Sequence, residues 1–277
     1  MMDASGERIV LVIPCYNEAD RLPVQRISDT VSAHTWMSLV LVDDGSADGT
    51  RAVLEGLAQA NPGRIKVHAL DCNGGKGEAV RQGMRFATEV FPEAGYAGYF
   101  DADLATPLEE AAHLLEGVRG ARPSLIMGSR VNLMGTTRIL RSAKRHYIGR
   151  LFATLVSEML KLPVYDTQCG AKLVRMDRVQ ALFLEPFLTR WLFDVELIWR
   201  VVNLVGRAQA HDEIAEVPVR SWQEQGGSKV KWIDGVRVPS QLWRIRRHYR
   251  EQEQALSPAH TILIRSSAMS SRPVSRK

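Results

Sequence analysis

Short apolar runs alternate with stretches of helical periodicity from Arg8 to Gly128, and this alternation limits the possible folds more than any other feature of the sequence. It is the pattern of a mostly parallel β-sheet whose crossover connections are helices on both faces. The sequence therefore predicts an α/β fold. The expected strands are 9–13, 39–42, 65–69, 98–100 and 125–127, and the expected helices are 19–33, 49–60, 76–90 and 108–119.

The second half of the chain is less regular. An apolar helical stretch is predicted at 148–160, a further helix at 192–205 and a strand at 213–219. After Trp222 the chain becomes basic and aromatic, and its last residues are rich in Ser, Arg and Pro. We therefore expect a flexible N-terminus at 1–7, one domain at 8–250 with two parts, 8–130 and 131–250, and a disordered tail at 251–277.

Composition fits a globular domain with basic character. Of 277 residues, 45% are hydrophobic and 24% charged, which suffices for one large core. The net charge of +5 and the pI near 9.2 favour anionic partners without choosing among nucleotides, phosphates, acidic lipids and nucleic acid. Three cysteines, an odd number in a chain of this length, indicate a reducing compartment, which we interpret as the cytosol.

Neither a signal peptide nor a membrane span is expected. The first eight residues contain no apolar segment, and no apolar run reaches the roughly 20 residues that a spanning helix requires.

Polar residues follow three of the predicted strands. Pro14-Cys15-Tyr16-Asn17-Glu18 ends the first, Asp43-Asp44-Gly45-Ser46 the second and Asp101-Ala102-Asp103 the fourth. Ligands of open α/β sheets bind outside the carboxyl ends of the strands, and buried carboxylates are costly unless they are paired. Each group alone fits a turn with a helix cap, but together they predict a binding site.

The spacing of Asp101 and Asp103 suits a divalent metal. One carboxylate can reach Mg²⁺ or Mn²⁺ while the other holds ribose or a metal-bound water, and both metals prefer oxygen ligands combined with substrate phosphates. The alternative is a solvated acidic loop that caps the next helix.

A glycine-rich turn, Asn73-Gly74-Gly75-Lys76-Gly77, follows the third predicted strand and begins a helix. Its backbone can approach a ligand closely, and Lys76 can meet an anion. The turn is neither a P-loop nor a dinucleotide-binding fingerprint, and a tight strand-to-helix turn explains its glycines nearly as well.

In this order, these motifs resemble the family 2 glycosyltransferases of GT-A fold, a Rossmann-like α/β architecture. Further segments resemble the branch that glucosylates dolichyl or polyprenyl phosphate, and its mannosyl relatives: Gly128-Ser129-Arg130, Asp166-Thr167-Gln168-Cys169-Gly170, Trp191-Leu192-Phe193-Asp194-Val195-Glu196 and Gly227-Ser228-Lys229. The resemblance covers about residues 8–235. It implies that 8–130 binds the nucleotide and that 131–250 binds the acceptor.

The resemblance also implies roles for individual residues. Asp101, Ala102 and Asp103 would lie at the ribose and diphosphate, with Asp103, and Asp101 beside it, at the metal. Arg130 and Lys229 would meet phosphates of donor or acceptor, for which fixed positive charge is suited. The nucleoside would be held by Pro14, Tyr16, Glu18, Val42, Asp43 and Asp44.

One position departs from the pattern of the mannosyl relatives. They often carry Gln, Ser or Glu two residues after the second Asp as an added metal ligand, where this chain has Ala105. The metal then has fewer protein ligands, and the expected donor is UDP-glucose rather than GDP-mannose.

The resemblance implies inverting transfer, which requires stabilisation of the departing diphosphate and, for a hydroxyl acceptor, a general base. A lipid monophosphate is already ionised near neutral pH and needs no base. Asp166 is a candidate catalytic carboxylate by its position in the family pattern, and a turn residue is the alternative. Asp194 is a second candidate, although an acid that begins a helix also has a structural explanation.

The expected partners are a nucleotide-sugar donor and a lipid-phosphate acceptor, with possible peripheral contact at the cytosolic membrane face. Basic residues before the 148–160 helix, and Arg244, Arg246 and Arg247 after Trp243, could contact anionic lipid. A solvated basic face is the alternative. A family 2 enzyme with a hydroxyl acceptor is the second hypothesis. A nucleic-acid-binding module is the third and has only the basic charge in its favour, so no nucleic-acid partner is expected.

Overall fold

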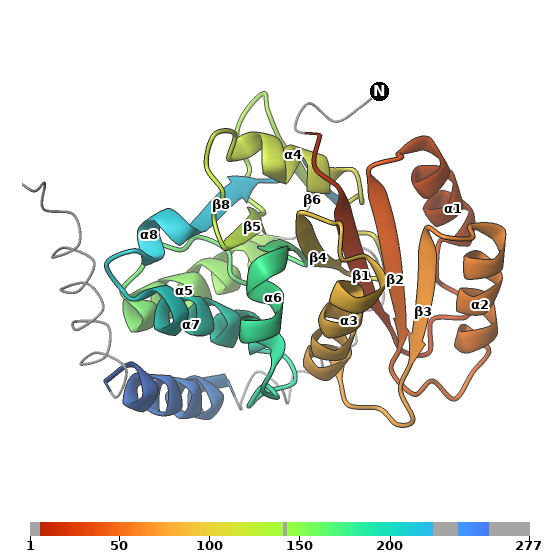
Figure 1. The fold of residues 1–277 in the computed structure, drawn as a ribbon. Coiled ribbons are helices and arrows are strands. Elements are labelled where there is room, and N and C mark those ends of the chain that lie inside the picture. The colour runs from red at the N-terminus through yellow and green to blue at the C-terminus, as the bar shows by residue number, and fades with distance from the viewer. Residues whose placement is uncertain (1–5, 141–142, 224–237, 255–277) are drawn as a thin grey trace, which may run out of the picture.

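A seven-stranded mixed sheet forms the centre of the protein (Figure 1). The computed structural model describes residues 6–140, 143–223 and 238–254. The strand order is β3-β2-β1-β4-β7-β5-β8, and every neighbouring pair is parallel except those that β7 makes with β4 and β5. The strands are β1 (Ile9–Cys15), β2 (Met37–Asp43), β3 (Ile65–Ala69), β4 (Tyr96–Phe100), β5 (Leu125–Ser129), β7 (Ala171–Arg175) and β8 (Ile214–Pro218).

Helices cover both faces of this sheet, which confirms the predicted α/β class. One face carries α1 (Val24–Ala33), α2 (Thr50–Ala60) and α4 (Glu110–Gly117). The other carries α3 (Lys76–Val90), α5 (Ala143–Leu160), α6 (Met176–Phe183), α7 (Phe193–Val205) and an unlabelled helix at residues 238–254. The short α8 (Ala210–Glu213) precedes β8.

The side chains of β1 explain this two-sided packing. Val10 and Val12 belong to one buried cluster, while Ile9, Leu11 and Ile13 belong to the other. Successive side chains of a strand point to opposite faces, so a strand buried on both sides must be apolar throughout.

The helix expected at 19–33 begins only at Val24, directly after Pro23. The preceding residues are bonded to the loop after β2 instead. The N–H of Asn17 donates to Ser46 Oγ at 3.0 Å, and the N–H of Glu18 donates to Thr50 Oγ1 at 2.8 Å. These residues therefore form a loop with a single turn, in which the N–H groups of Arg21 and Leu22 donate to the carbonyl of Glu18, rather than a continuous helix.

The antiparallel strand β7 was not predicted. It pairs Ala171 with Phe100 of β4 and separates β4 from β5. Because β7 runs against β4, the residues just before β7 lie at the edge where β4 ends. A small second sheet, β6 (Arg138–Leu140) with β9 (Ser221–Gln223), was also not predicted. The helix described at 238–254 includes residues 251–254, which were expected to belong to the tail.

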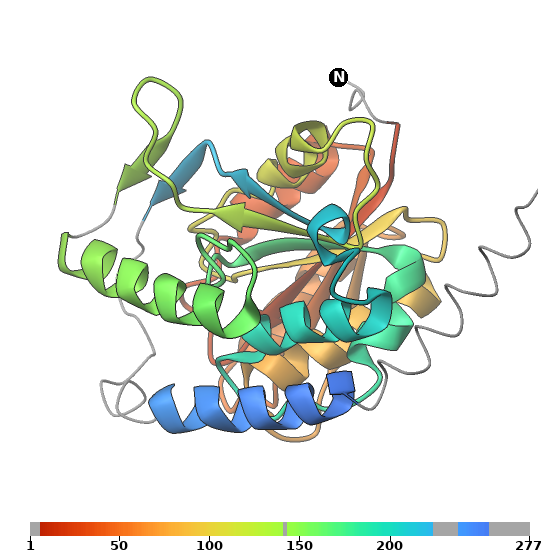
Figure 2. The same ribbon diagram turned by 90° about the vertical axis from the view of Figure 1, so that its left-hand side faces the viewer.

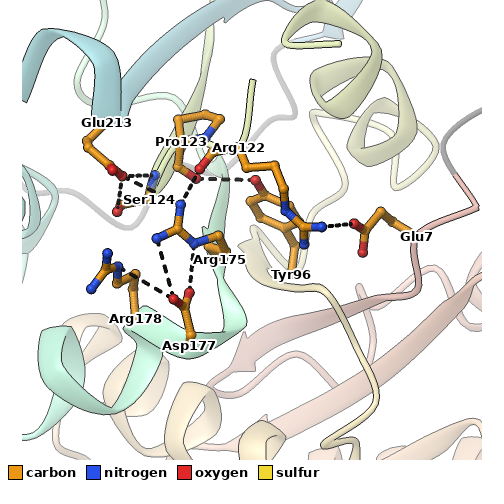
Figure 3. Close-up of polar contacts among 9 residues, drawn as sticks. All are labelled: Glu7, Tyr96, Arg122, Pro123, Ser124, Arg175, Asp177, Arg178 and Glu213. Atoms are coloured by element: carbon orange, nitrogen blue, oxygen red, sulfur yellow. Dashed lines mark hydrogen bonds and ion pairs between the residues drawn. The ribbon is translucent and has the colours of Figure 1, made fainter. Parts of the chain in front are cut away.

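A polar cluster lies at the amino ends of the parallel strands, at the opposite end of the sheet from the loops after β1, β2 and β4 (Figure 3). Arg175 at the end of β7 donates to Asp177 at 2.7 Å and lies 3.7 Å from Glu213. Arg122 pairs with Glu7 at 2.9 Å, and the Tyr96 hydroxyl donates to the carbonyl of Pro123 at 3.2 Å. Since the arginines here face carboxylates, we assign the cluster to structure.

Candidate active site

The carboxyl ends of β1, β2 and β4 lie beside the beginnings of α3 and β7, all at the same end of the sheet. The N–H of Asp44 donates to the carbonyl of Cys15 at 2.9 Å, which joins the first two strand ends. The predicted acidic groups thus lie on neighbouring elements, as the position of ligands in open α/β sheets requires.

Asp44 organises the glycine-rich turn. Its carboxylate accepts hydrogen bonds from the N–H groups of Gly74 at 2.8 Å and Gly75 at 3.0 Å, and from the Asn73 amide at 3.0 Å. Burial raises the pKa of Asp44, and the two backbone bonds oppose that shift. In this structure the turn therefore binds a carboxylate of the protein itself.

Gly45 must be a glycine for the two loops to meet. Its φ is +64°, and a Cβ there would lie 2.6 Å from the carbonyl carbon of Cys72. A side chain would be strained by the dihedral and would separate the loop after β2 from the loop after β3.

Lys76, the first residue of α3, forms an ion pair with Asp101. Its Nζ lies 2.5 Å from Asp101 Oδ1 and 5.8 Å from the centre of the Phe193 ring. Burial alone would lower the pKa of Lys76, but the charges of Asp101 and Asp194 outweigh it and raise that pKa. Lys76 is therefore a fixed cation among carboxylates.

Asp103 lies at the surface, and its Oδ1 accepts the N–H of Ala105 at 2.9 Å. Partial desolvation raises the pKa of Asp103, and the neighbouring Asp101 adds to the shift. A carboxylate with this excess of negative charge around it is suited to a cation. Among the described residues, no group of three or more His, Cys, Asp or Glu is arranged so that it could hold a metal ion.

Gly170 fits against Asp101. The N–H of Asp101 donates to the carbonyl of Gly170 at 3.2 Å, and a Cβ on Gly170 would overlap the Asp101 carboxylate. The segment before β7 therefore shapes the position of Asp101 although about 70 residues separate the two in sequence.

Arg130 and Asp166 form a second ion pair, between the end of β5 and the segment before β7. Arg130 Nε and Nη2 lie 2.6 and 2.8 Å from the two oxygens of Asp166. Burial alone would raise the pKa of Asp166, but Arg130 outweighs it and lowers that pKa. Glu216 holds the same segment by accepting the N–H groups of Tyr165 at 2.7 Å and Asp166 at 2.6 Å.

A pocket opens beside this ion pair. Part of its lining comes from the ends of the paired segments: Arg130, Tyr165, Asp166, Thr167 and Gln168. The rest comes from α5: Gly149, Arg150, Phe152 and Ala153. The guanidinium carbon of Arg150 lies 3.8 Å from the centre of the Tyr165 ring, which places a second arginine at this pocket.

Asp194, the other predicted catalytic residue, is buried in the first turn of α7. Its Oδ1 accepts the Tyr99 hydroxyl at 2.6 Å and lies 2.7 Å from Lys172 Nζ. These bonds favour the structural alternative for Asp194. Its charge still acts on the site, because it contributes to the raised pKa of Lys76.

The other predicted residues lie around the same edge, with one exception. Val42, Asp43 and Ala102 are buried, Pro14 and Glu18 are partly buried, and Tyr16 is exposed. The Asp43 carboxylate accepts the N–H of Ser46 at 3.1 Å. Lys229 lies outside the described residues.

Two cations of the site were not predicted from the sequence. Arg190 lies against Gly75, and its charge opposes the rise in the pKa of Asp44 that burial causes; no local pattern pointed to it. Lys172 is fully buried against Asp194, and the signal for it was a lone lysine in the apolar run of β7. Glu196 fixes the loop that bears Arg190, because it accepts the N–H groups of Leu188 at 2.8 Å and Thr189 at 2.9 Å.

The chain belongs to glycosyl transferase family 2, whose sequence model matches residues 10–183. It is similar to the dolichyl-phosphate β-glucosyltransferase of Homo sapiens, with 31% identity over 246 residues that cover 82% of this chain and 71% of that protein. The dolichyl-phosphate β-glucosyltransferase of Saccharomyces cerevisiae is 29% identical over 261 residues, which cover 86% and 74% of the two chains.

Solved structures agree in fold. Glucosyl-3-phosphoglycerate synthase of Mycobacterium tuberculosis, solved with Mn²⁺, UDP and phosphoglyceric acid, superimposes with a TM-score of 0.59 at 17% identity and covers 91% of this chain and 78% of its own. The same enzyme was also solved with Mg²⁺ and UDP. The central sheet is therefore that of a GT-A glycosyltransferase.

Proposed function

We propose that this protein transfers glucose from UDP-glucose to a polyprenyl phosphate, with inversion at the anomeric carbon. The observation that carries the proposal is the placement of two ion pairs, Lys76–Asp101 and Arg130–Asp166, at the segment that leads into β7 in a family 2 chain: Asp101 lies against Gly170, and Asp166 precedes Gly170 in that segment. One pair belongs to the nucleotide-binding half, and the other joins β5 to the second half. The relatives named as dolichyl-phosphate β-glucosyltransferases support the choice of donor and acceptor.

The donor would lie over the ends of β1, β2 and β4. In this proposal the nucleoside contacts are Pro14, Tyr16, Glu18, Val42, Asp43 and Asp44, and Ala102 lies at the ribose. Asp103, with Asp101, would hold Mg²⁺ or Mn²⁺, which would offset the charge of the departing diphosphate. The Mn²⁺ and Mg²⁺ complexes of the Mycobacterium tuberculosis enzyme support this choice of metals.

Lys76 and Arg190 would act on the diphosphate as fixed cations. Lys76 already lies among Asp101, Asp103 and Asp194, so an incoming diphosphate and metal would take up its charge in place of Asp101. Arg190 borders the glycine-rich turn at Gly75. Preorganised positive charge at a developing negative charge lowers the barrier of group transfer.

The acceptor phosphate would bind at Arg130, with Arg150 and Lys229 as further candidate contacts. Asp166 uses both oxygens to hold the guanidinium of Arg130, so we assign it the positioning of that group. A phosphate monoester is ionised near neutral pH, and its attack therefore needs no general base. A reaction without a general base also agrees with the burial of Asp194 in contact with Tyr99 and Lys172.

A polyprenyl phosphate resides in a membrane, and we propose that the protein reaches it from the cytosolic face as a peripheral protein. Within the described residues, no helix has both the length and the apolar character to cross a bilayer.

A panel of donors and acceptors tests the proposal. Purified protein with Mg²⁺ or Mn²⁺ is given UDP-glucose or GDP-mannose, with either a short-chain polyprenyl phosphate or 3-phosphoglycerate. We expect glucosyl transfer to the lipid phosphate, lost on chelation of the metal. Transfer to 3-phosphoglycerate with none to the lipid phosphate would show that the acceptor is a soluble phosphate and would contradict the proposed lipid acceptor.

A further inference from the structure

Helix α5 exposes an apolar stripe to solvent. Its large exposed residues are Tyr147, Ile148, Leu151 and Leu155, which are 72%, 59%, 65% and 55% exposed. Their spacing places them along one side of the helix over about two and a half turns. Surface helices ordinarily present polar residues on this side, so the stripe needs an explanation.

The orientation of α5 is fixed by its other side. Ala153, Val156 and Leu160 are buried, and the last two belong to the cluster that covers one face of the central sheet. Rotating the helix to bury the stripe would expose these residues. Figure 2 shows α5, in bright green, along the outside of the molecule.

The stripe lies next to the pocket at Arg130. Gly149, Arg150, Phe152 and Ala153 line that pocket from the same turns of α5 that carry Ile148 and Leu151 on the outside. One helix thus has a pocket with cationic side chains on one side and an apolar surface on the other.

The sequence that leads into the stripe is basic. Arg138 lies exposed in β6, just before the helix, and the sequence of α5 begins Ala143-Lys144-Arg145 ahead of the stripe. A helical sequence that combines basic residues with aliphatic and aromatic ones is typical of segments that lie in the membrane interface. A tyrosine at the end of the stripe fits the boundary between headgroups and acyl chains.

We propose that the α5 stripe docks on the surface of an anionic bilayer. Tyr147, Ile148, Leu151 and Leu155 enter the interface, which brings the pocket on the inner side of α5 to within about one helix diameter, about 10 Å, of the headgroups. A phosphate in that pocket keeps its hydrocarbon chain in the membrane. The link between docking and catalysis rests on the proposed acceptor, whereas docking itself does not.

Vesicle binding tests the stripe without using the reaction. The variant Leu151→Gln/Leu155→Gln keeps good helix formers at both positions. Val24→Gln/Leu184→Gln is the matched control, since it also replaces two exposed aliphatic side chains, in α1 and after α6. Each protein is sedimented with vesicles of phosphatidylcholine and phosphatidylserine, and circular dichroism checks the folding of each.

We expect the unmodified protein and the control to bind alike, and the stripe variant to lose about tenfold or more in partition coefficient because it no longer buries two leucines. Affinity for UDP should stay the same in all three. With a short, water-soluble polyprenyl phosphate the three should turn over equally, and with a long-chain acceptor in vesicles only the stripe variant should be slow.

Several results would overturn the docking proposal. The unmodified protein could fail to bind anionic vesicles, or the stripe variant could bind as well as its parent. Light scattering could show a dimer that the stripe variant converts to a monomer, which would assign the stripe to contact between two copies of the chain. A protein that binds vesicles through the stripe but glucosylates no lipid phosphate would contradict the proposed function alone.

Discussion

Arg130 and Asp166 form a bidentate ion pair, closed by a third hydrogen bond from the Arg130 backbone N–H to the same carboxylate at 3.0 Å. Both side chains are mostly buried. The pair fastens the end of β5 to the segment that precedes β7, and it orients the guanidinium toward the pocket beside α5. Arg130, which we expect to contact the acceptor phosphate, is thus held by an ion pair whose contribution to stability can be measured without substrate.

Asp166→Asn should lower the free energy of unfolding by about 3–5 kcal/mol, because it leaves the buried charge of Arg130 without its partner. Urea unfolding measures the change. The matched control is Asp177→Asn, which breaks an arginine–aspartate pair whose aspartate is largely exposed and should cost about 1 kcal/mol or less. Equal losses in the two variants would contradict the assignment.

The pH dependence of stability gives a second measure of the same pair. The folded-state pKa of Asp166 lies below its ordinary value near 4, so the pair contributes fully at pH above about 4. That contribution is lost as the pH falls through the lower folded value, where the carboxylate takes up a proton. In Asp166→Asn, the free energy of unfolding should therefore fall less between neutral and acid pH than in the parent. The same pH dependence in both proteins would argue against the pair.

Asp103→Ala should reduce transfer about a hundredfold or more while the protein stays folded, because a proposed metal ligand at the surface serves the diphosphate more than the core. The rate of transfer at rising Mn²⁺ concentration measures the loss of activity, and the unfolding curve shows whether the protein stays folded. Near-normal metal-dependent turnover would place the metal elsewhere.

Gly170→Ala should displace the Asp101 carboxylate, since the added Cβ would overlap it. We expect about a hundredfold loss of turnover, as a small misplacement of a positioned group can cause. Gly56→Ala, on the exposed side of α2 with open space around its Cβ, is the control. Full activity in Gly170→Ala would mean that the position of Asp101 is unimportant.

UDP-glucose should bind more tightly than GDP-mannose. The motivation is Ala105, which offers no metal ligand where mannosyl relatives often have one, and the similarity to glucosyltransferases. Isothermal titration calorimetry with each donor and Mg²⁺ measures the difference. Equal or reversed affinities would remove the branch assignment and leave the family unchanged.

Replacing Arg244, Arg246 and Arg247 together by Gln should weaken binding to anionic vesicles, most visibly at low salt. These side chains are exposed on the 238–254 helix, and each basic residue near an anionic bilayer contributes about 1 kcal/mol. Arg247 should contribute least, because Glu251 lies 3.1 Å from it. Sedimentation at rising salt measures the effect. If the variant binds as well as its parent at every salt concentration, the 238–254 helix does not contact the bilayer.

The parallel half of the sheet could be predicted because each strand carries its own signal. The apolar runs that became β1, β2, β3, β4 and β5 are separated by clear helical stretches, and only their ends were misjudged. β7 has no comparable signal, since its lysine breaks the apolar run and its partners are distant in sequence. Its place depends on tertiary pairing, which local propensity does not encode.

The candidate site was predicted in its parts but not in its pairings. Lys76, Asp101, Arg130 and Asp166 were all identified, yet the contacts between them join residues 25 and 36 positions apart. Arg190 was missed because its position depends on the loop that Glu196 holds. A loop residue whose position depends on a side chain of the following helix leaves no periodic pattern in the sequence.

The insertion of β7 between β4 and β5 also bears on how the chain folds as it is synthesised. Residues 9–129 contain every strand up to β5, but β5 reaches the rest of the sheet only through β7, so it has no place there until residue 175 has been made. Until then, the free edge of β4 must stay exposed or be covered by another molecule. Any cut between residues 130 and 170 should therefore yield a fragment prone to aggregation rather than an independent nucleotide-binding domain.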